Sequence, residues 1–207
     1  YWGAGNQKGL IESIGTVLSL SFLAGVSLTP ICLIVIEPAL YGMNVPESAL
    51  SEAVDYLSIL CLGNVFLYCA TSLSFVMRGL GDSRSPLYFT LFGGLINIGL
   101  DIGLVVFCGW GVKGAAWATV AAQAGALMFA IIYLKKRGFI FEFKPANFKL
   151  RPDQARLIMR IGLAAMAQLM VVHISYLMVS ALLNGSWAKG AAAAGVGLKI
   201  CTLAVMP

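Results

Sequence analysis

The sequence has very few charged residues for its length. Of its 207 residues, 11% are charged and 59% are hydrophobic. A soluble domain is about a quarter charged, and the surface of a soluble fold grows too quickly with size to be covered by so few polar side chains. The shortage of charge excludes a soluble globular protein. It favours a chain embedded in a lipid bilayer, where every backbone polar group must pair within its own helix or barrel.

Clustered reactive groups are missing as well. The five cysteines all fall in apolar runs and none forms a CxxC pair, so we interpret them as small hydrophobic packing residues. The acidic residues are scattered, and the single histidine stands apart from them. A membrane enzyme would need paired carboxylates or a His/Asp set at the membrane surface. We therefore expect no enzyme activity and no cofactor.

The sequence instead contains long intervals without charged residues. Four intervals contain no charged residue and a fifth contains only Asp101; they run from Glu12 to Glu37, Asp55 to Arg78, Lys113 to Lys135, Arg160 to Lys189, and Arg84 to Lys113. Each is long enough for a helix, rising 1.5 Å per residue, to cross about 30 Å of hydrocarbon. The runs are continuously apolar, whereas strands of a membrane barrel alternate. The sequence predicts an all-α, polytopic transmembrane helix bundle.

The positions of the charges also predict where the helices lie. Five full spans are expected, at residues 13–36, 56–77, 86–108, 114–134 and 161–183, and a sixth begins near Ala188 and is cut off at Pro207. The chain begins at Tyr1 and stops inside an apolar run. We therefore expect it to be a fragment of a larger protein.

The distribution of basic residues predicts the orientation of the chain. The loop at 135–160 holds the densest group of Lys and Arg, and the opposite side holds only Lys113 and Lys189. Because basic loops stay on the cytoplasmic side, we expect the loop at 135–160 to be cytoplasmic. The net charge of +5 then reflects topology, and we expect no nucleic-acid partner.

Turn residues mark the boundaries between helices. In the long loop, Pro152 followed by Asp153 is typical of a helix start, and we expect a boundary between two helical bundles here. A turn at 79–83 precedes Ser85 and Pro86, which we predict to be the N-cap and first residue of the next helix.

Polar residues inside the third and fourth spans carry the predicted chemistry. Asn97 and Asp101 are four residues apart and share one helix face. An acidic residue at this depth costs about 2.5–3.5 kcal/mol, so it should face a bundle interior or a wet cavity. One hypothesis is a cation site with oxygen ligands, or a carboxyl group that exchanges a proton. The other hypothesis is that Asp101 has a structural role, in which it pairs with a lysine or forms a hydrogen bond to a neighbouring helix. In the fourth span, Thr119 belongs to a stripe that would allow close helix approach, and its other members are small: Ala115, Ala122 and Ala126. Gln123 lies one turn beyond Thr119, and Thr119 could also bond its own helix.

Three further polar residues interrupt apolar runs near the end of the chain: Gln168, His173 and Lys199. They could line a substrate cavity with Gln123. A lone histidine in a helix is more often satisfied structurally, and Lys199 could extend to the membrane surface instead.

Several motifs together resemble the multidrug and toxic compound extrusion (MATE) family. They are GAGN at 3–6, MRGLGDSRSPL at 77–87, NIGLD at 97–101, WGVKGAAWAT at 110–119 and IGL at 161–163. The resemblance implies part of a fold of twelve helices in two lobes, from the end of helix 2 into helix 8. Residues 1–137 would complete the N-lobe, 138–155 would be a cytoplasmic interlobe loop, and 156–207 would begin the C-lobe.

The resemblance also implies a function. The family exports organic, often cationic, drugs and metabolites in exchange for Na⁺ or H⁺, by alternating access. Asp101, Asn97 and Thr119 fall where prokaryotic members bind the coupling cation, and Asp101 and Asn97 would be metal ligands only if that cation is Na⁺. Ala164 stands where the family often has proline, and this chain has no glutamate in helix 7, which favours a site in the N-lobe.

Partners and location follow from the same resemblance. We expect a multi-pass protein of the inner cell membrane, a monomer when full length, with a small organic molecule as its substrate. One alternative is a flippase for lipid-linked precursors, which shares the helical plan. A membrane subunit without transport activity is the other, although it would not explain the polar face of Asn97 and Asp101.

Overall fold

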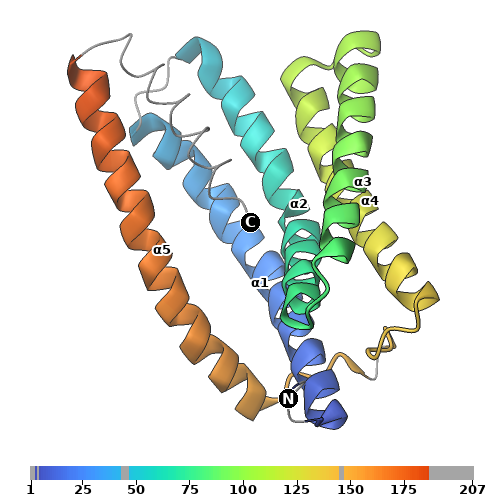
Figure 1. Ribbon diagram of the computed structural model, residues 1–207. Coiled ribbons are helices and arrows are strands. Elements are labelled where there is room, and N and C mark those ends of the chain that lie inside the picture. Colours follow the sequence, from blue (N-terminus) through green and yellow to red (C-terminus); the bar gives the residue numbers. More distant parts are fainter. Residues whose placement is uncertain (1–2, 4, 43–46, 145–146, 187–207) are drawn as a thin grey trace. The chain divides into compact units, whose positions relative to one another are not determined.

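The computed structural model describes the chain except residues 1–2, 4, 43–46, 145–146 and 187–207. The described residues form helices and loops without strands. The elements in chain order are α1 (Gln7–Gly42), α2 (Glu47–Gly79), α3 (Arg84–Asp101), η1 (Ile102–Phe107), α4 (Gly111–Lys136) and α5 (Pro152–Ser186) (Figure 1). Five helical stretches are long and apolar enough to cross a membrane. The predicted class, an all-α transmembrane bundle, is confirmed.

Each predicted span lies inside one of these helical stretches or differs from it by a single residue at one end. The helices are longer than the spans because polar residues at the membrane surface continue the helical hydrogen bonding: α1 begins at Gln7 and α5 at Pro152. The third span is not uniform, however. It is α-helical as far as Asp101 and then π-helical over Ile102–Phe107, a change in winding that apolar spacing does not reveal.

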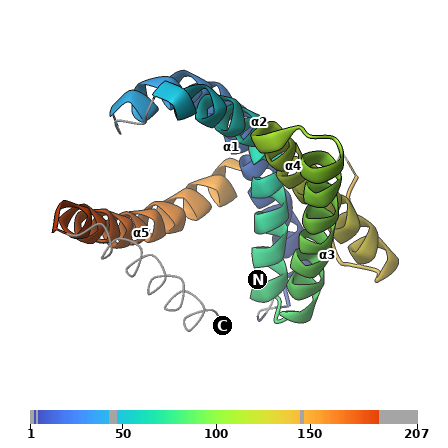
Figure 2. The ribbon, with the colours of Figure 1, turned by 90° about the horizontal axis from the view of Figure 1, so that it is seen from above.

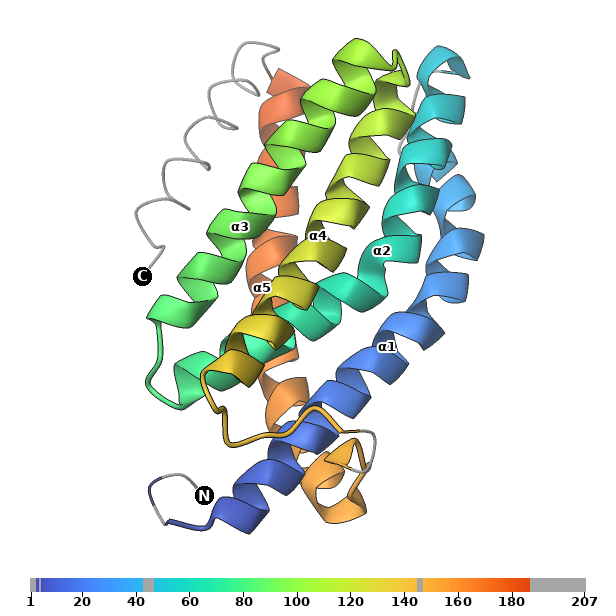
Figure 3. The same cartoon turned by 90° about the vertical axis from the view of Figure 1, so that its right-hand side faces the viewer.

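The chain divides into two compact units, residues 1–155 and 156–207. In the first unit α2 packs against both α1 and α4, and α3 packs along the far side of α4. In the upper half of the side view the helices follow the order α1, α2, α4, α3, whereas the lower half of α2 passes behind α4 toward the start of α3, which it also contacts (Figure 2 and Figure 3). The second unit contains the rest of α5. The assignment of these units to two lobes of a larger protein stays a prediction.

Small residues set the spacing between neighbouring helices. A Cβ atom at Gly63 of α2 would lie 2.6 Å from Cγ2 of Val120 in α4. Ala116 and Ala118 of α4 have no exposed surface. In a bilayer, lipid tails solvate large apolar side chains as well as another helix does. Helices therefore associate through close van der Waals packing, which small side chains allow.

The hydrophobic core of the first unit lies at the end of the bundle that carries the N-terminus. Its buried residues come from all four helices and from the loop after α4: Leu10, Ile14, Leu18, Leu73, Met77, Phe89, Ala130, Leu134 and Phe141. Most other large apolar side chains of the helices are exposed. Their exposure is the pattern expected where lipid covers the outer faces of the helices.

A segment of the loop after α4 is fastened to α1. We call residues 147–151 the strap. The carbonyl of Lys149 accepts a hydrogen bond from the Thr16 hydroxyl at 3.3 Å, and the guanidinium of Arg151 pairs with Glu12 at 2.9 Å. A Cβ atom at Gly15 would overlap the carbonyl oxygen of Asn147. The predicted interlobe loop therefore ends in a segment fixed to the first unit.

The start of α3 differs from the prediction. The helix begins at Arg84, so Ser85 and Pro86 are not its N-cap and first residue. The Asp82 carboxylate accepts hydrogen bonds from the backbone N–H groups of Arg84 and Ser85 and from the Ser85 hydroxyl, the last at 2.6 Å. An aspartate satisfies two free N–H groups at once, which a serine hydroxyl one turn later cannot do.

Candidate functional site

The predicted site lies where α3 and α4 pack together. A Cβ atom at Gly93 would lie 3.0 Å from Cβ of Ala126, and Ala122 is almost fully buried. The small residues predicted to allow close approach of the fourth span thus face α3. The two helices run side by side (Figure 3), so polar groups on their facing surfaces can meet.

Asn97 of α3 and Thr119 of α4 do meet. The side-chain amide of Asn97 donates to the Thr119 hydroxyl oxygen at 3.4 Å, and that hydroxyl donates in turn to the carbonyl of Ala115 at 3.0 Å. The bond of Thr119 to its own helix, which the sequence left open, is therefore present, and a contact with α3 accompanies it. The carbonyl oxygen of Asn97 and a lone pair on Thr119 remain available as oxygen ligands.

A groove of about 360 Å³ opens beside this pair. Asn97, Thr119 and Gln123 line it, together with Thr90 and the small residues Gly93, Gly94, Ala122 and Ala126. The Thr90 hydroxyl is bonded to the carbonyl of Pro86 at 3.0 Å. Gln123, predicted to line a substrate cavity, thus shares one groove with two of the predicted cation ligands.

Asp101 lies one turn beyond Asn97, at the last residue of α3. Its Oδ1 atom is enclosed and accepts no hydrogen bond from any residue that the structure describes. An ionisable group left without a partner in the apolar layer costs several kcal/mol. Asp101 is not among the residues that line the groove, and the hydrogen bonds of the Asn97 and Thr119 side chains do not include it.

The π-helical segment starts directly after Asp101. In η1 the backbone N–H of Cys108 bonds to the carbonyl of Gly103, five residues earlier, at 3.0 Å. Single-turn π-helical segments frequently occur at functional sites. Here the wider winding rotates the residues after Asp101 away from the positions that a continuous α-helix would give them.

The ligand chemistry of the region is poor in charge. Within the described parts of the chain, no three His, Cys, Asp or Glu side chains come together in a way that could hold a metal ion. One carboxylate with amide and hydroxyl oxygens nearby is chemistry suited to a hard monovalent cation or to a proton.

The other predicted cavity residues lie in α5 or beyond it. Gln168 and His173 are exposed members of α5 in the second unit. The His173 ring bonds through Nδ1 to the carbonyl of Leu169 at 2.8 Å, the structural role considered from the sequence. Lys199 lies outside the described residues.

Sequence reasoning missed a polar network near the ends of α2 and α4. Arg137 donates to Asp82 at 3.1 Å and to the Ser85 hydroxyl at 3.3 Å, and its guanidinium lies over the Tyr133 ring. Asp82 belongs to the MRGLGDSRSPL motif, but nothing in the sequence indicates that Arg137 reaches it. The hydrogen bonds from the Ser85 hydroxyl and backbone hold the pKa of the Asp82 carboxyl below its ordinary value.

Comparison with known proteins decides the family. The family model described as MatE matches residues 1–102. The "Probable multidrug resistance protein YoeA" of Bacillus subtilis is 30% identical over all of this chain, which covers 46% of that relative. The chain belongs to the MATE family.

Another relative agrees with membership of the MATE family, and a solved structure shows the same fold. The "Probable multidrug resistance protein NorM" of Thermotoga maritima is 29% identical over 99% of this chain and 45% of its own length. A structure described as the outward-facing conformation of a multidrug resistance MATE family transporter superposes with a TM-score of 0.81. The two sequences are 24% identical, and the matched region covers 92% of this chain and 43% of the transporter. This MATE chain therefore spans nearly half the length of YoeA and of the NorM protein of Thermotoga maritima.

Proposed function

We propose that this chain forms part of a cation-coupled antiporter that exports organic, often cationic, molecules across the cell membrane by alternating access. Asp101 is the group that binds the coupling cation, Na⁺ or H⁺, and Asn97 and Thr119 supply further oxygen ligands. The loop at 135–160 lies on the cytoplasmic side. The names of the relatives, which describe multidrug resistance proteins, support the class of substrate.

A single observation carries this proposal. The Oδ1 atom of Asp101 is enclosed within a membrane-spanning stretch and has no hydrogen-bond partner among the described residues. An unpaired carboxyl group is unfavourable if its role is packing alone, because an apolar residue would avoid its desolvation penalty. A group that is partnered by a cation for part of a transport cycle explains why it stays without a protein partner.

Coupling then follows from differential binding. If the cation binds more tightly when the site faces one side, it shifts the population of conformations toward that state. Substrate affinity must change by the same factor, by linkage. The antiporter therefore needs a cation site whose geometry changes between states, and the junction of α3 with η1 beside Asp101 is a place where helical winding already changes.

The experiment is a comparison of two Asp→Asn variants in the full-length protein. Asp101→Asn should reach the membrane normally but lose efflux of a cationic dye driven by an imposed Na⁺ or H⁺ gradient. The matched control is Asp55→Asn: this residue pairs with Lys113 at 2.9 Å and is partly exposed. It should retain efflux. Gradient-driven efflux by Asp101→Asn at the unmodified rate would contradict the assignment.

A flippase for lipid-linked precursors is the alternative that this assay separates. Both kinds of protein share the helical plan, so the fold does not distinguish them. Dye efflux that follows the imposed cation gradient supports the antiporter. Lipid translocation without dye efflux, under the same gradient, supports the flippase.

A further inference from the structure

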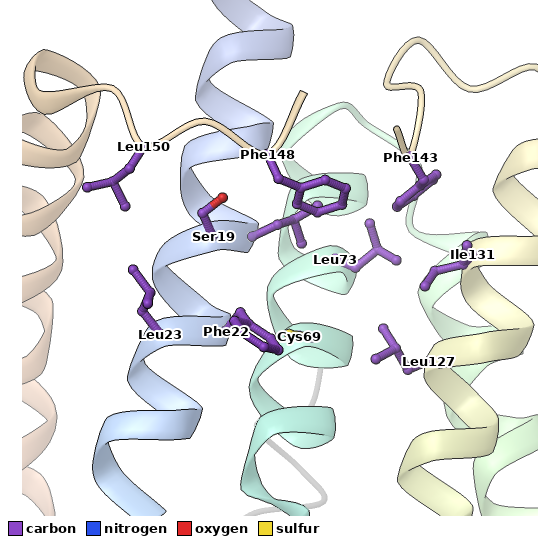
Figure 4. Close-up of a pocket in the computed structure, with 11 residues that line it drawn as sticks. Ser19, Phe22, Leu23, Cys69, Leu73, Leu127, Ile131, Phe143, Phe148 and Leu150 are labelled. Atoms are coloured by element: carbon purple, nitrogen blue, oxygen red, sulfur yellow. The ribbon is translucent and has the colours of Figure 1, made fainter. Parts of the chain in front are cut away.

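A second cavity lies away from the groove at Asn97, underneath the loop after α4. It has a volume of about 450 Å³ and is lined almost entirely by apolar side chains from α1, α2, α4 and the loop. Figure 4 shows Phe143, Phe148 and Leu150 reaching from the loop toward the helices, with Phe22 and Leu73 among the residues opposite them. All of these residues belong to the first unit.

One polar atom is enclosed in this apolar cavity. The Oγ atom of Ser19 is buried and has no hydrogen-bond partner among the described residues. Ser19 differs in this respect from Ser13 and Ser21 of the same helix, whose hydroxyls donate to carbonyls four residues earlier, at 2.8 and 2.9 Å. A buried hydroxyl left unbonded is unfavourable by about 1–3 kcal/mol, so a ligand that accepts a hydrogen bond there would be favoured.

The strap separates this cavity from a polar pocket on its other side. Its residues alternate: Phe148 and Leu150 line the apolar cavity, while Lys149 and Arg151 line the polar pocket. The polar pocket has a volume of about 520 Å³ and also includes Lys8. Residues 148–151 of the strap thus present an apolar surface to one side and a basic surface to the other, as alternating side chains of an extended segment do.

Charge in the polar pocket is not balanced. Arg151 is neutralised by Glu12 at 2.9 Å. Lys8 and Lys149 also line the pocket, and neither forms an ion pair within the part of the chain that the structure describes. Two positive charges therefore lie beside an apolar cavity, at the basic end that the charge distribution assigns to the cytoplasm. The cytoplasmic leaflet is the one rich in anionic lipids.

We propose that the strap and its two pockets form a binding site for an anionic phospholipid of the cytoplasmic leaflet. Lys8 and Lys149 bind the phosphate-containing head group, and one acyl chain fills the apolar cavity under Phe148 and Leu150. Rotation about the Cα–Cβ bond of Ser19 brings its enclosed hydroxyl to an ester carbonyl, to which it donates a hydrogen bond. The site uses none of the residues assigned to the cation, and it shares with the transport proposal only the cytoplasmic orientation of the loop.

The test measures lipid retention by the purified full-length protein in neutral detergent, using native mass spectrometry. The probes are phosphatidylglycerol and phosphatidylcholine with the same acyl chains. Lys8→Gln with Lys149→Gln should reduce the preference for phosphatidylglycerol by about fivefold per lysine, since each basic residue near a membrane surface contributes about 1 kcal/mol. Retention of phosphatidylcholine should change little.

The matched control removes two other lysines, Lys135 in the last turn of α4 and Lys144 in the loop after it. Lys135 and Lys144 line neither pocket, and Lys144 already pairs with Glu142 at 2.7 Å. Lys135→Gln with Lys144→Gln should leave the phosphatidylglycerol preference intact. An equal fall in both double variants would mean that the effect is one of overall charge, and it would overturn the proposed site.

A second measurement locates the acyl chain without altering the protein. Phosphatidylglycerol carrying a photoactivated diazirine in its acyl chain should crosslink to peptides that contain residues 18–23 and 148–150. Crosslinks that avoid both segments would overturn the proposal, whether the cavity is then filled by another part of the polypeptide or by nothing specific.

Discussion

The two carboxylates at the ends of α3 have opposite surroundings. Asp82 precedes the helix and receives hydrogen bonds from Arg84, Ser85 and Arg137. Asp101 ends the helix, and its Oδ1 atom receives none from the described residues. Asp82 lies in the turn between two membrane-spanning stretches, where polar groups are available as hydrogen-bond partners. Asp101 lies within a membrane-spanning stretch.

The difference separates stability from function. A carboxylate that accepts several hydrogen bonds stabilises the fold, because the charge-assisted bonds together outweigh its desolvation penalty. A carboxylate without partners in an apolar layer can only weaken the fold. We therefore expect Asp82 to matter for stability and Asp101 for transport, and changes at each residue should separate these two properties.

The largest effect should come from replacing Asp101 with an apolar residue. Asp101→Leu should reduce gradient-driven efflux to the background while leaving the melting temperature in detergent unchanged or raising it by several degrees, since it removes a group that costs about 2.5–3.5 kcal/mol. Efflux assays and thermal unfolding of the same full-length preparation check both parts. A large fall in melting temperature would make Asp101 a structural residue and end the contrast with Asp82.

A smaller effect is expected at Thr119. Thr119→Val keeps the shape of the side chain but removes the oxygen that accepts from Asn97. The apparent cation affinity for efflux should fall about tenfold, as for loss of one hydrogen bond to a charged group. Thr119→Ser keeps that oxygen and is the control. If Ser and Val weaken the affinity equally, the methyl group and not the hydroxyl is what matters.

Packing between α3 and α4 gives the third comparison. Gly93→Val would press against Ala126, and we expect it to destabilise the protein by about 1–3 kcal/mol, the usual cost of overpacking. At Gly94 a Cβ atom meets nothing within 4 Å in the described structure, so Gly94→Val should lower the melting temperature less. If both variants lower the melting temperature equally, the cause is shared by the two positions and is not overpacking against Ala126.

The smallest effect concerns the pH dependence of the cap at Asp82. Asp82→Ala should cost about 1 kcal/mol at neutral pH, as for other helix caps. Because the folded protein lowers the pKa of this carboxyl below 3.8, its contribution is present above that pH and is lost as the pH falls further. Melting temperatures of the variant and the unmodified protein should therefore converge in acid. A constant difference down to the lowest pH would contradict this role.

Charge spacing was sufficient to predict most of the fold. The interval from Lys113 to Lys135 predicted a span at 114–134, and α4 occupies Gly111–Lys136. The reason is physical: a charge inside the hydrocarbon is so unfavourable that its absence over twenty residues marks a span. Helix ends were less predictable, because Asp82, Ser83 and Ser85 are all acceptable caps and only the backbone geometry chooses between them.

Parts of the site were predictable for a similar reason. Helical periodicity places Asn97 and Asp101 on one face, and the structure joins Asn97 to Thr119 and places Gln123 in the same groove. The π-helical winding after Asp101 was not predictable, because apolar residues fill both kinds of helix equally well. Contacts across long separations, such as Thr16 with the strap, leave no pattern in a single sequence.

Infrared difference spectroscopy of the full-length protein tests the central claim most directly. Spectra recorded while Na⁺ is added, or while the proton concentration is changed, report the carboxyl groups that bind either cation. The account predicts a carboxyl band that responds to one of these cations and that disappears in Asp101→Asn but persists in Asp55→Asn. A cation-dependent spectrum that is identical with and without the Asp101 carboxylate would contradict it.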